Sequence, residues 1–193
     1  MRARLLPNET DEQLMTAVQQ GDSHALGILF DRHHQSLYRY FLRMSGSASV
    51  SEDLTQDVFL RLLRKGDTWQ KDARFTSWMY RIAHNSFIDQ TRKRKWEAAM
   101  PEHLDTAAPA SNNLERHQEH ALLRRALMAL PPDKRELLVL SRYQGLKYEQ
   151  IGELLGIETN TVKVRVFRAI GQLREIYGRL SGEPGLALAE GRK

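Results

Sequence analysis

The stretch from Tyr148 to Arg174, YEQIGELLGIETNTVKVRVFRAIGQLR, decides how the end of this chain folds. Apolar residues recur at helical spacing on both sides of a short break at Gly156, which predicts two helices joined by a tight turn. Glycine adopts the left-handed backbone conformation at low cost, so Gly156 suits the turn. Gly152 lies inside the first helix, where it costs about 1 kcal/mol relative to alanine. We therefore expect another backbone segment to approach Gly152 closely in a helix-turn-helix unit.

The second helix of this unit is rich in cations. Thr159 is a plausible N-cap, and four apolar residues at helical spacing are expected to face inward: Val162, Val166, Ile170 and Leu173. The cations around the rest of the helix are Lys163, Arg165, Arg168 and Arg174. A helix-turn-helix unit places its second helix in the DNA major groove. The pattern favours DNA binding over its alternative, an amphipathic hairpin with a solvated basic face.

Composition sets outer limits on the function. The chain has 193 residues, a net charge of +5 and no cysteine, which excludes a disulfide framework, a thiol nucleophile and cysteine-bound zinc. The first residues, MRARLLPNETDEQ, lack the apolar core of a signal peptide. No apolar run approaches the roughly 18 residues of a membrane span. We expect a soluble, cytoplasmic protein without membrane insertion.

Helical periodicity extends over nearly all of the chain between Thr10 and Tyr177. Capping boxes are expected at Thr10 with Gln13 and at Ser49 with Glu52, and Asp22 can cap the helix between them. The expected fold is all-α, with two small helical domains joined by a flexible linker, the second a helix-turn-helix domain. The expected boundaries are residues 10–96 for the first domain, 97–113 for the linker, 114–179 for the second domain and 180–193 for a mobile tail.

Three stretches resemble one family in this order: SEDLTQDVFL from Ser51, FTSWMYRIAHN from Phe75, and LPPDKRE from Leu130 followed by the helix-turn-helix. Together they resemble a bacterial extracytoplasmic-function (group IV) sigma factor of the sigma-70 family, over about residues 11–177. The resemblance implies a protein that binds RNA polymerase core, through its beta and beta-prime subunits, and directs promoter recognition, DNA melting and transcription initiation. It implies no catalysis and no cofactor, and it implies an anti-sigma factor as a further partner.

The resemblance also assigns candidate contacts. Core polymerase is expected to contact Asp53, Gln56, Asp57, Leu60 and Arg61. The minus-10 DNA is expected to contact Trp69, Gln70, Lys71, Arg74, Phe75, Arg81, Asn85, Arg92, Lys93, Arg94 and Lys95. In this set the loop 66–74 would bind an unpaired base, which needs apolar walls, polar groups and cations. We expect Trp78 and Phe87 to belong to the core instead.

The minus-35 DNA is expected to contact Thr159, Asn160, Thr161, Lys163, Val164, Arg165, Phe167 and Arg168. Arginine and lysine suit guanine, and apolar side chains suit the thymine methyl group; Arg165 is expected at a phosphate. The sequence departs from the commonest family pattern at Glu158, Asn160 and Val164, which leaves the start of the helix open by about one residue.

Two other readings compete with this one. His117 and His120 are three residues apart and could share a metal ion, but no carboxylate cluster accompanies them, so we expect no metal site and no enzyme. The stronger alternative is a stand-alone helix-turn-helix regulator whose amino-terminal domain senses a ligand or dimerises. A sensor domain needs a pocket or a dimer face, whereas this one carries an aromatic, basic loop suited to single-stranded DNA.

Overall fold

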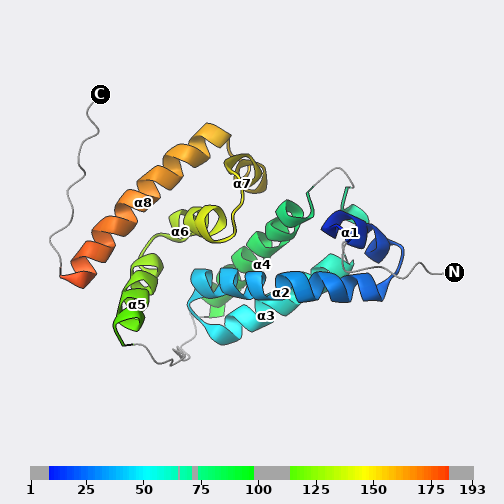
Figure 1. Cartoon of the computed structure of the whole chain (residues 1–193), viewed down its shortest axis with the longest axis horizontal. Helices are drawn as coiled ribbons and strands as arrows, with labels where there is room; N and C mark the ends of the chain where they lie inside the picture. The colour runs from blue at the N-terminus through cyan, green and yellow to red at the C-terminus, as the bar shows by residue number, and fades with distance from the viewer. Residues whose placement is uncertain (1–8, 65, 71–73, 98–113, 183–193) are drawn as a thin grey trace. The chain divides into compact units, whose positions relative to one another are not determined.

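The structure is a computed structural model that describes residues 9–64, 66–70, 74–97 and 114–182 (Figure 1). All regular elements in these residues are helices, which confirms the all-α prediction. None of the helices within these ranges combines the length and the apolar character needed to cross a membrane. The chain divides into two compact units, the first built mainly from residues up to 105 and the second mainly from residues 106 onward.

The first unit is a bundle of four α-helices. They are α1 (Asp11–Gln19), α2 (Ser23–Ser45), α3 (Ala48–Arg64) and α4 (Phe75–Glu97), with a 3-10 turn η1 (Gly66–Thr68) after α3. Their core residues are apolar at helical spacing, including Leu29, Leu37, Tyr40 and Phe41 of α2, Leu54, Val58 and Leu62 of α3, and Met79 and Ala83 of α4. The rings of Tyr40 and Tyr80 meet edge to face, with centroids 5.5 Å apart, which fixes α2 against α4.

The first helices begin where the sequence provides caps. Thr10 and Gln13 form the expected capping box, with Thr10 N donating to Gln13 Oε1 at 2.8 Å and Gln13 N donating to Thr10 Oγ1 at 3.2 Å. Asp22 accepts from His24 N at 2.8 Å before α2. The start of α3 differs from the expectation, because Ser47 and not Ser49 lies at the cap position and accepts from Val50 N at 3.5 Å.

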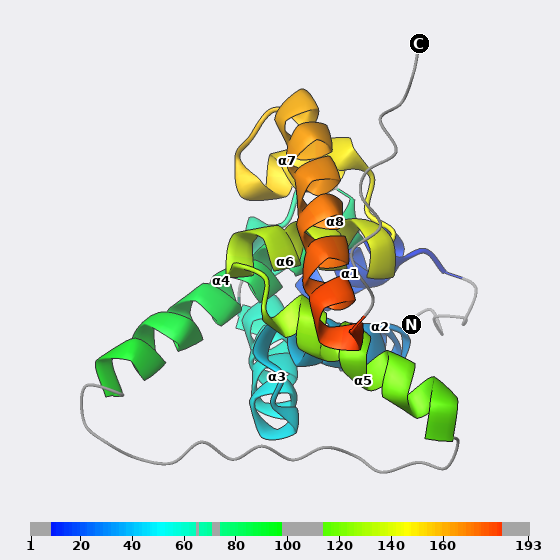
Figure 2. The ribbon, with the colours of Figure 1, turned by 90° about the vertical axis from the view of Figure 1, so that its left-hand side faces the viewer.

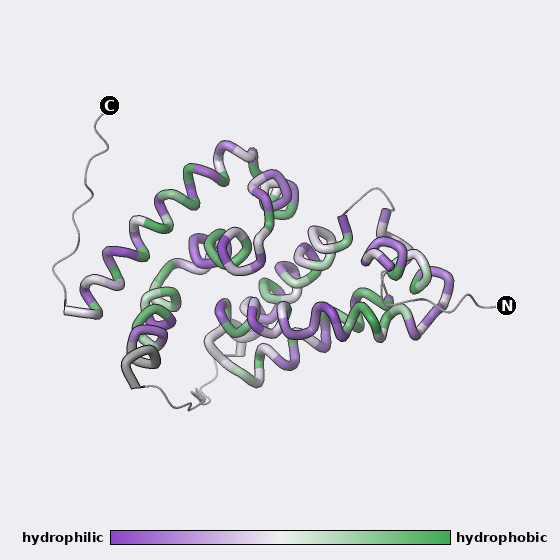
Figure 3. The backbone as a smooth tube through the Cα atoms, viewed as in Figure 1, coloured by the Kyte–Doolittle hydropathy of each residue, from purple (hydrophilic) through white to green (hydrophobic). Residues whose placement is uncertain are grey.

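The second unit is arranged around one long helix. It consists of α5 (Leu114–Met128), α6 (Pro132–Leu138), a π-helical turn η2 (Val139–Tyr143), α7 (Tyr148–Leu155) and α8 (Thr159–Ser181). Helix α8 packs against α5, α6 and α7, and α7 lies beside its first turns (Figure 2). Hydrophilic and hydrophobic stretches alternate along α8 (Figure 3), as one buried and one solvated face require.

Arg135 of the LPPDKRE stretch ties α5 to α6. Its guanidinium donates to the carbonyl oxygens of Leu127 at 3.1 Å, Met128 at 2.7 Å and Leu130 at 3.0 Å. The last carbonyls of a helix have no partner within it, so Arg135 satisfies the end of α5. Burial lowers the pKa of this guanidinium below its usual value.

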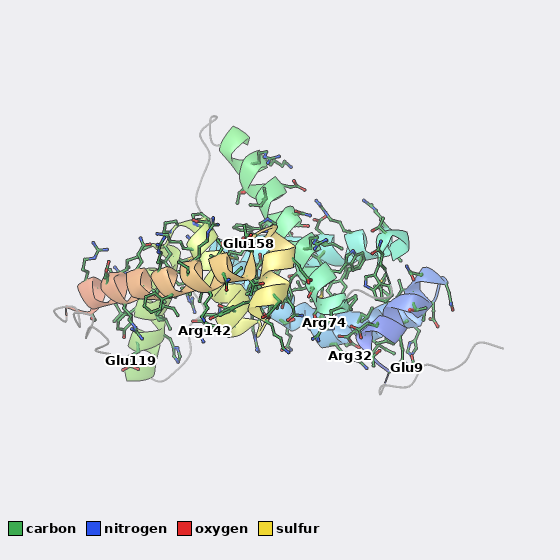
Figure 4. The ribbon with its side chains drawn as sticks, turned by 90° about the horizontal axis from the view of Figure 1, so that it is seen from above. Glu9, Arg32, Arg74, Glu119, Arg142 and Glu158 are labelled. Atoms are coloured by element: carbon green, nitrogen blue, oxygen red, sulfur yellow. The ribbon has the colours of Figure 1, made fainter. Side chains whose placement is uncertain are left out.

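The helix-turn-helix has the expected turn. Gly156 adopts the left-handed conformation with φ of 68°, and Ile157 N donates to Gly152 O at 3.0 Å. The start of α8 differs from the expectation: Glu158 is the N-cap residue, with ψ of 144°, and Thr159 is the first helical residue (Figure 4). Four residues of α8 are buried, Val162, Val166, Ala169 and Ile176, whereas Ile170 and Leu173 are half-buried.

Candidate nucleic-acid interfaces

The solvent face of α8 combines cations with exposed apolar side chains. Phe167 is 72% exposed and Val164 is 47% exposed, and the two lie next to each other on this face. Asn160, Lys163, Val164, Phe167 and Arg168 follow one another at i, i+3, i+4, i+7 and i+8, so they share one face of the helix. Each of the five is exposed. The structure therefore brings together the expected base contacts.

The other three expected residues of this helix lie to the sides of that face. Arg165 is exposed, and Thr159 and Thr161 are half-buried. At about 100° per residue, Arg165 is rotated well away from Asn160 and Phe167. This position suits a contact with the DNA backbone more than one with a base edge.

A second cationic face lies on α4. Arg81, Asn85 and Arg92 are exposed, and their separations place them within about 40° of one another around the helix. Gln70 and Arg74, just before α4, are exposed as well. Figure 2 shows the last turns of α4 standing clear of α2 and α3, and these turns carry exposed Arg92 and Lys93. Lys71 and the side chains of Arg94 and Lys95 lie outside the described parts of the chain.

Two aromatic residues expected at the DNA lie in the core instead. Trp69 is 3% exposed and Phe75 is fully buried. The Phe75 ring lies 5.4 Å from the His33 ring of α2. Both rings are buried, so neither is on the surface to stack on a base. Phe87 is buried as expected, and Trp78 is half-buried.

The outer face of α3 contains the residues expected at polymerase. Asp53, Gln56 and Leu60 are exposed, with Leu60 at 52%. Asp57 and Arg61 are engaged within the unit: Arg61 Nε lies 2.7 Å from Asp57 Oδ2, and Arg61 Nη1 lies 3.1 Å from Asp89 Oδ2 of α4. Arg61 therefore joins α3 to α4, and Asp57 pairs with it from within α3.

Sequence reasoning missed one member of this surface. Leu63 is 53% exposed and lies three residues after Leu60. No contact was predicted for Leu63, because the helical period alone does not determine which apolar residues of α3 face outward.

Sequence reasoning also missed the contacts of α1. Asp11 Oδ2 lies 2.8 Å from His33 Nε2, and Arg32 Nη1 donates to Asp11 Oδ1 at 2.9 Å and to Glu9 O at 2.7 Å (Figure 4). Burial raises the pKa of Asp11, but hydrogen bonds from His33 and Arg32, with their charges, outweigh it and hold that pKa below its usual value. His34, which follows His33 in the sequence, binds Phe30 O through Nδ1 at 2.8 Å.

The described residues hold no group of three or more histidine, cysteine, aspartate or glutamate side chains that could bind a metal ion. His33 and His34 are accounted for by the contacts above. The side chain of His117 lies outside the described set.

Comparison with known proteins places the two candidate DNA faces in two named regions. Residues 29–97 match the sigma-70 region 2 family, and residues 120–173 match the sigma-70 region 4 family. The chain is 37% identical over 186 residues to the ECF RNA polymerase sigma factor SigE of Mycolicibacterium smegmatis, covering 90% of this chain and 72% of SigE. It is 34% identical over 176 residues to the RNA polymerase sigma factor CarQ of Myxococcus xanthus, covering 88% of this chain and 98% of CarQ.

Solved structures agree on the fold. The sigma factor RpoE of Bartonella quintana, in complex with the anti-sigma factor NepR, superposes with a TM-score of 0.65 at 26% identity, covering 76% of this chain and 92% of that one. CnrH in complex with the cytosolic domain of CnrY superposes with a TM-score of 0.70 at 22% identity, covering 89% of this chain and 99% of CnrH.

Proposed function

Because the chain belongs to the extracytoplasmic-function sigma factors of the sigma-70 family, we propose that its two units divide promoter recognition and promoter opening between them. It is a sigma factor that binds RNA polymerase core and directs transcription initiation. One observation carries the assignment of the two units: the exposed cationic faces of α4 and α8 fall inside the segments that match regions 2 and 4.

The second unit recognises the minus-35 DNA through α8. Asn160, Lys163 and Arg168 can form hydrogen bonds with base edges in the major groove. Val164 and Phe167 lie among them and are exposed, so they suit contact with thymine methyl groups. Arg165, rotated away from this face, contacts a phosphate and contributes affinity that does not depend on sequence.

The first unit opens the minus-10 DNA. Gln70 and Arg74 lie in the connection between α3 and α4, and Arg81 and Asn85 continue this polar surface along α4. Such groups can bind the edge of an unpaired base and its phosphates. Arg92 and Lys93 follow the duplex beyond it. Trp69 and Phe75, which adjoin Gln70 and Arg74 in the sequence, are buried and do not contribute to this surface.

The first unit also binds core polymerase, through the outer face of α3. Asp53, Gln56 and Leu60 supply an exposed patch that is polar at one end and apolar at the other. Exposed leucine side chains next to hydrogen-bonding groups are typical of the centre and rim of a protein interface. Asp57 and Arg61 shape this patch through their ion pair.

An anti-sigma factor is the expected negative regulator, since the solved relative RpoE is bound to one. The protein acts where polymerase acts, in the cytoplasm, and its contribution is binding and not catalysis. The test of this proposal is complex formation followed by promoter opening. The chain and core polymerase, mixed at equal concentration, should elute together from a sizing column and make thymines near the minus-10 position reactive to permanganate. Binding to duplex DNA without binding to core would contradict it.

A further inference from the structure

Helix α1 contacts both ends of the connection between α3 and α4. Gln19 Nε2 donates to Gly66 O at 2.8 Å and to Trp69 O at 3.1 Å. At the other end, Phe75 N donates to Glu12 Oε1 at 3.1 Å. Figure 1 shows α1 beside the turn that follows α3. One short helix therefore holds the backbone where the connection begins and where it ends.

The hydrogen bonds of Gln19 and Glu12, which we call the two anchors, both act on backbone groups that fix the local conformation. Gly66 O also accepts from Trp69 N at 3.0 Å, so Gln19 binds a turn that is already closed. Phe75 is the first residue of α4, and the first N–H groups of a helix have no partner within it. Glu12 supplies that partner, and its carboxylate is favoured at a helix N-terminus by the helix dipole.

Helix α1 is itself firmly held. Leu14, Met15 and Val18 are buried, and a Cβ built at Gly66 would lie 3.2 Å from Met15 Cε, so Met15 packs directly on the turn. The contact of Asp11 with His33 joins α1 to α2. Because α1 is itself fixed, the backbone groups that Gln19 and Glu12 bind are fixed as well.

The anchored backbone positions lie next to the exposed side chains that are candidates for DNA contact. Gln70 follows Trp69 and Arg74 precedes Phe75, and both Gln70 and Arg74 are exposed. Helix α1 ends at Gln19, before the match to sigma-70 region 2 begins at residue 29.

We propose that α1 is a positioning element for promoter melting. Gln19 holds the turn from Gly66 to Trp69 and Glu12 holds the start of α4 at Phe75, so that the adjoining Gln70 and Arg74 meet an unpaired base and its phosphate. This inference rests on the proposed function of the first unit. A positioning role differs from a purely structural role in one measurable way. Removing the anchors should change the base preference of the protein while the fold of the protein and its affinity for core stay intact.

The experiment uses holoenzyme, formed from the full chain and core polymerase, and a random pool of single-stranded 20-nucleotide DNA. Strands that wild-type holoenzyme retains are sequenced to obtain a preferred motif, and a strand with that motif is then used for affinity measurements. The variants are Gln19→Ala and Glu12→Ala. Their matched controls are Gln20→Ala, an exposed glutamine one residue away, and Glu12→Gln, which keeps an acceptor oxygen for Phe75 N.

We expect Gln19→Ala and Glu12→Ala to bind the preferred strand on the order of tenfold more weakly, as the loss of one or two hydrogen bonds implies, and to select a less defined motif. Both controls should behave as wild type. Hydrogen exchange should be faster at the amides of Trp69 in Gln19→Ala and of Phe75 in Glu12→Ala, with unchanged helical circular dichroism and core affinity.

Three outcomes would overturn the inference in distinguishable ways. Faster exchange with unchanged motif and affinity would mean that the anchors do not position the DNA contacts. Parallel loss of core affinity and strand binding in both alanine variants would make α1 a structural support only. A wild-type holoenzyme that enriches no motif from the pool would contradict the proposed minus-10 function itself, and the inference with it.

Discussion

Gly152 and the carbonyl oxygen of Ile157 are in such close contact that a Cβ built on Gly152 would lie 2.6 Å from that oxygen. Helix α7 can therefore approach the turn before α8 only because residue 152 has no side chain. The obstacle is backbone, which cannot move aside as a flexible side chain can. The geometry of the helix-turn-helix depends on this contact, since it determines how α8 leaves the turn.

We predict that Gly152→Ala destabilises the second unit by about 1–3 kcal/mol, the usual cost of overpacking. Gly171→Ala is the matched control, because a Cβ there meets nothing within 4 Å and alanine favours helix by up to about 1 kcal/mol. Thermal unfolding followed by circular dichroism measures both. Equal stability of the two variants would show that the backbone contact can relax at no cost.

A second prediction concerns the minus-35 DNA. If Val164 and Phe167 contact thymine methyl groups, replacing the contacted thymine by deoxyuridine removes only that methyl and should weaken binding by about 1 kcal/mol, close to the value of one buried methylene. The same replacement should have little effect on a Phe167→Ala, Val164→Ala double variant. Competition binding with substituted duplexes measures this. An unchanged methyl effect in the double variant would assign these side chains another role.

A third prediction separates polymerase contacts from internal ones on α3. Leu60→Asp should weaken core affinity by more than tenfold, because a charge would be placed at the apolar end of the proposed interface. Gln35→Asp, at an exposed position of α2, should leave core affinity unchanged. Arg61→Ala should mainly lower stability, by at most about 1 kcal/mol, since its ion pairs are partly exposed. Fluorescence titration with core measures these affinities; retention of full affinity by Leu60→Asp would exclude this surface.

A fourth prediction concerns acid. The folded-state pKa of Asp11 lies below its usual 3.8, so its bonds contribute stability that is present above that value and is lost as pH falls through the lower, folded-state pKa. Asp11→Asn should cost about 1 kcal/mol at neutral pH, a low value because the group is partly exposed. The variant should also lose less stability than wild type below about pH 4. Urea unfolding across this range measures both effects, and parallel curves for the two proteins would contradict the assignment.

The sequence predicted those parts of the fold that depend on local chemistry. The capping box at Thr10, the cap at Asp22 and the left-handed Gly156 follow from side chains and backbone freedom within a few residues. The cationic face of α8 followed from helical period in the same way. The expected caps at Ser49 and Thr159 were wrong by one or two residues, since neighbouring polar residues can compete for one cap position.

The sequence could not predict features that depend on contacts between distant segments. Trp69 was expected at the DNA because it lies in a polar stretch, yet its side chain is buried. Its carbonyl oxygen accepts from Gln19 of α1, 50 residues earlier in the sequence. Gln19 binds the turn at Gly66, 47 residues later in the sequence. Nothing in the local sequence pattern distinguishes Gln19 from Gln20. The ion pair of Arg61 with Asp89 could not be predicted either, because the two residues lie on different helices.

Run-off transcription from linear genomic fragments, by core polymerase with and without this chain, tests most directly whether the chain directs transcription initiation. We expect discrete transcripts from defined start sites only when both are present, and we expect their loss in an Arg81→Ala, Asn85→Ala double variant. A template with a pre-melted bubble at the minus-10 position should restore much of that loss, because the protein no longer supplies the unpairing energy. If transcripts are identical with and without the chain, although α8 still binds duplex DNA, the chain does not direct initiation and a stand-alone regulator is favoured.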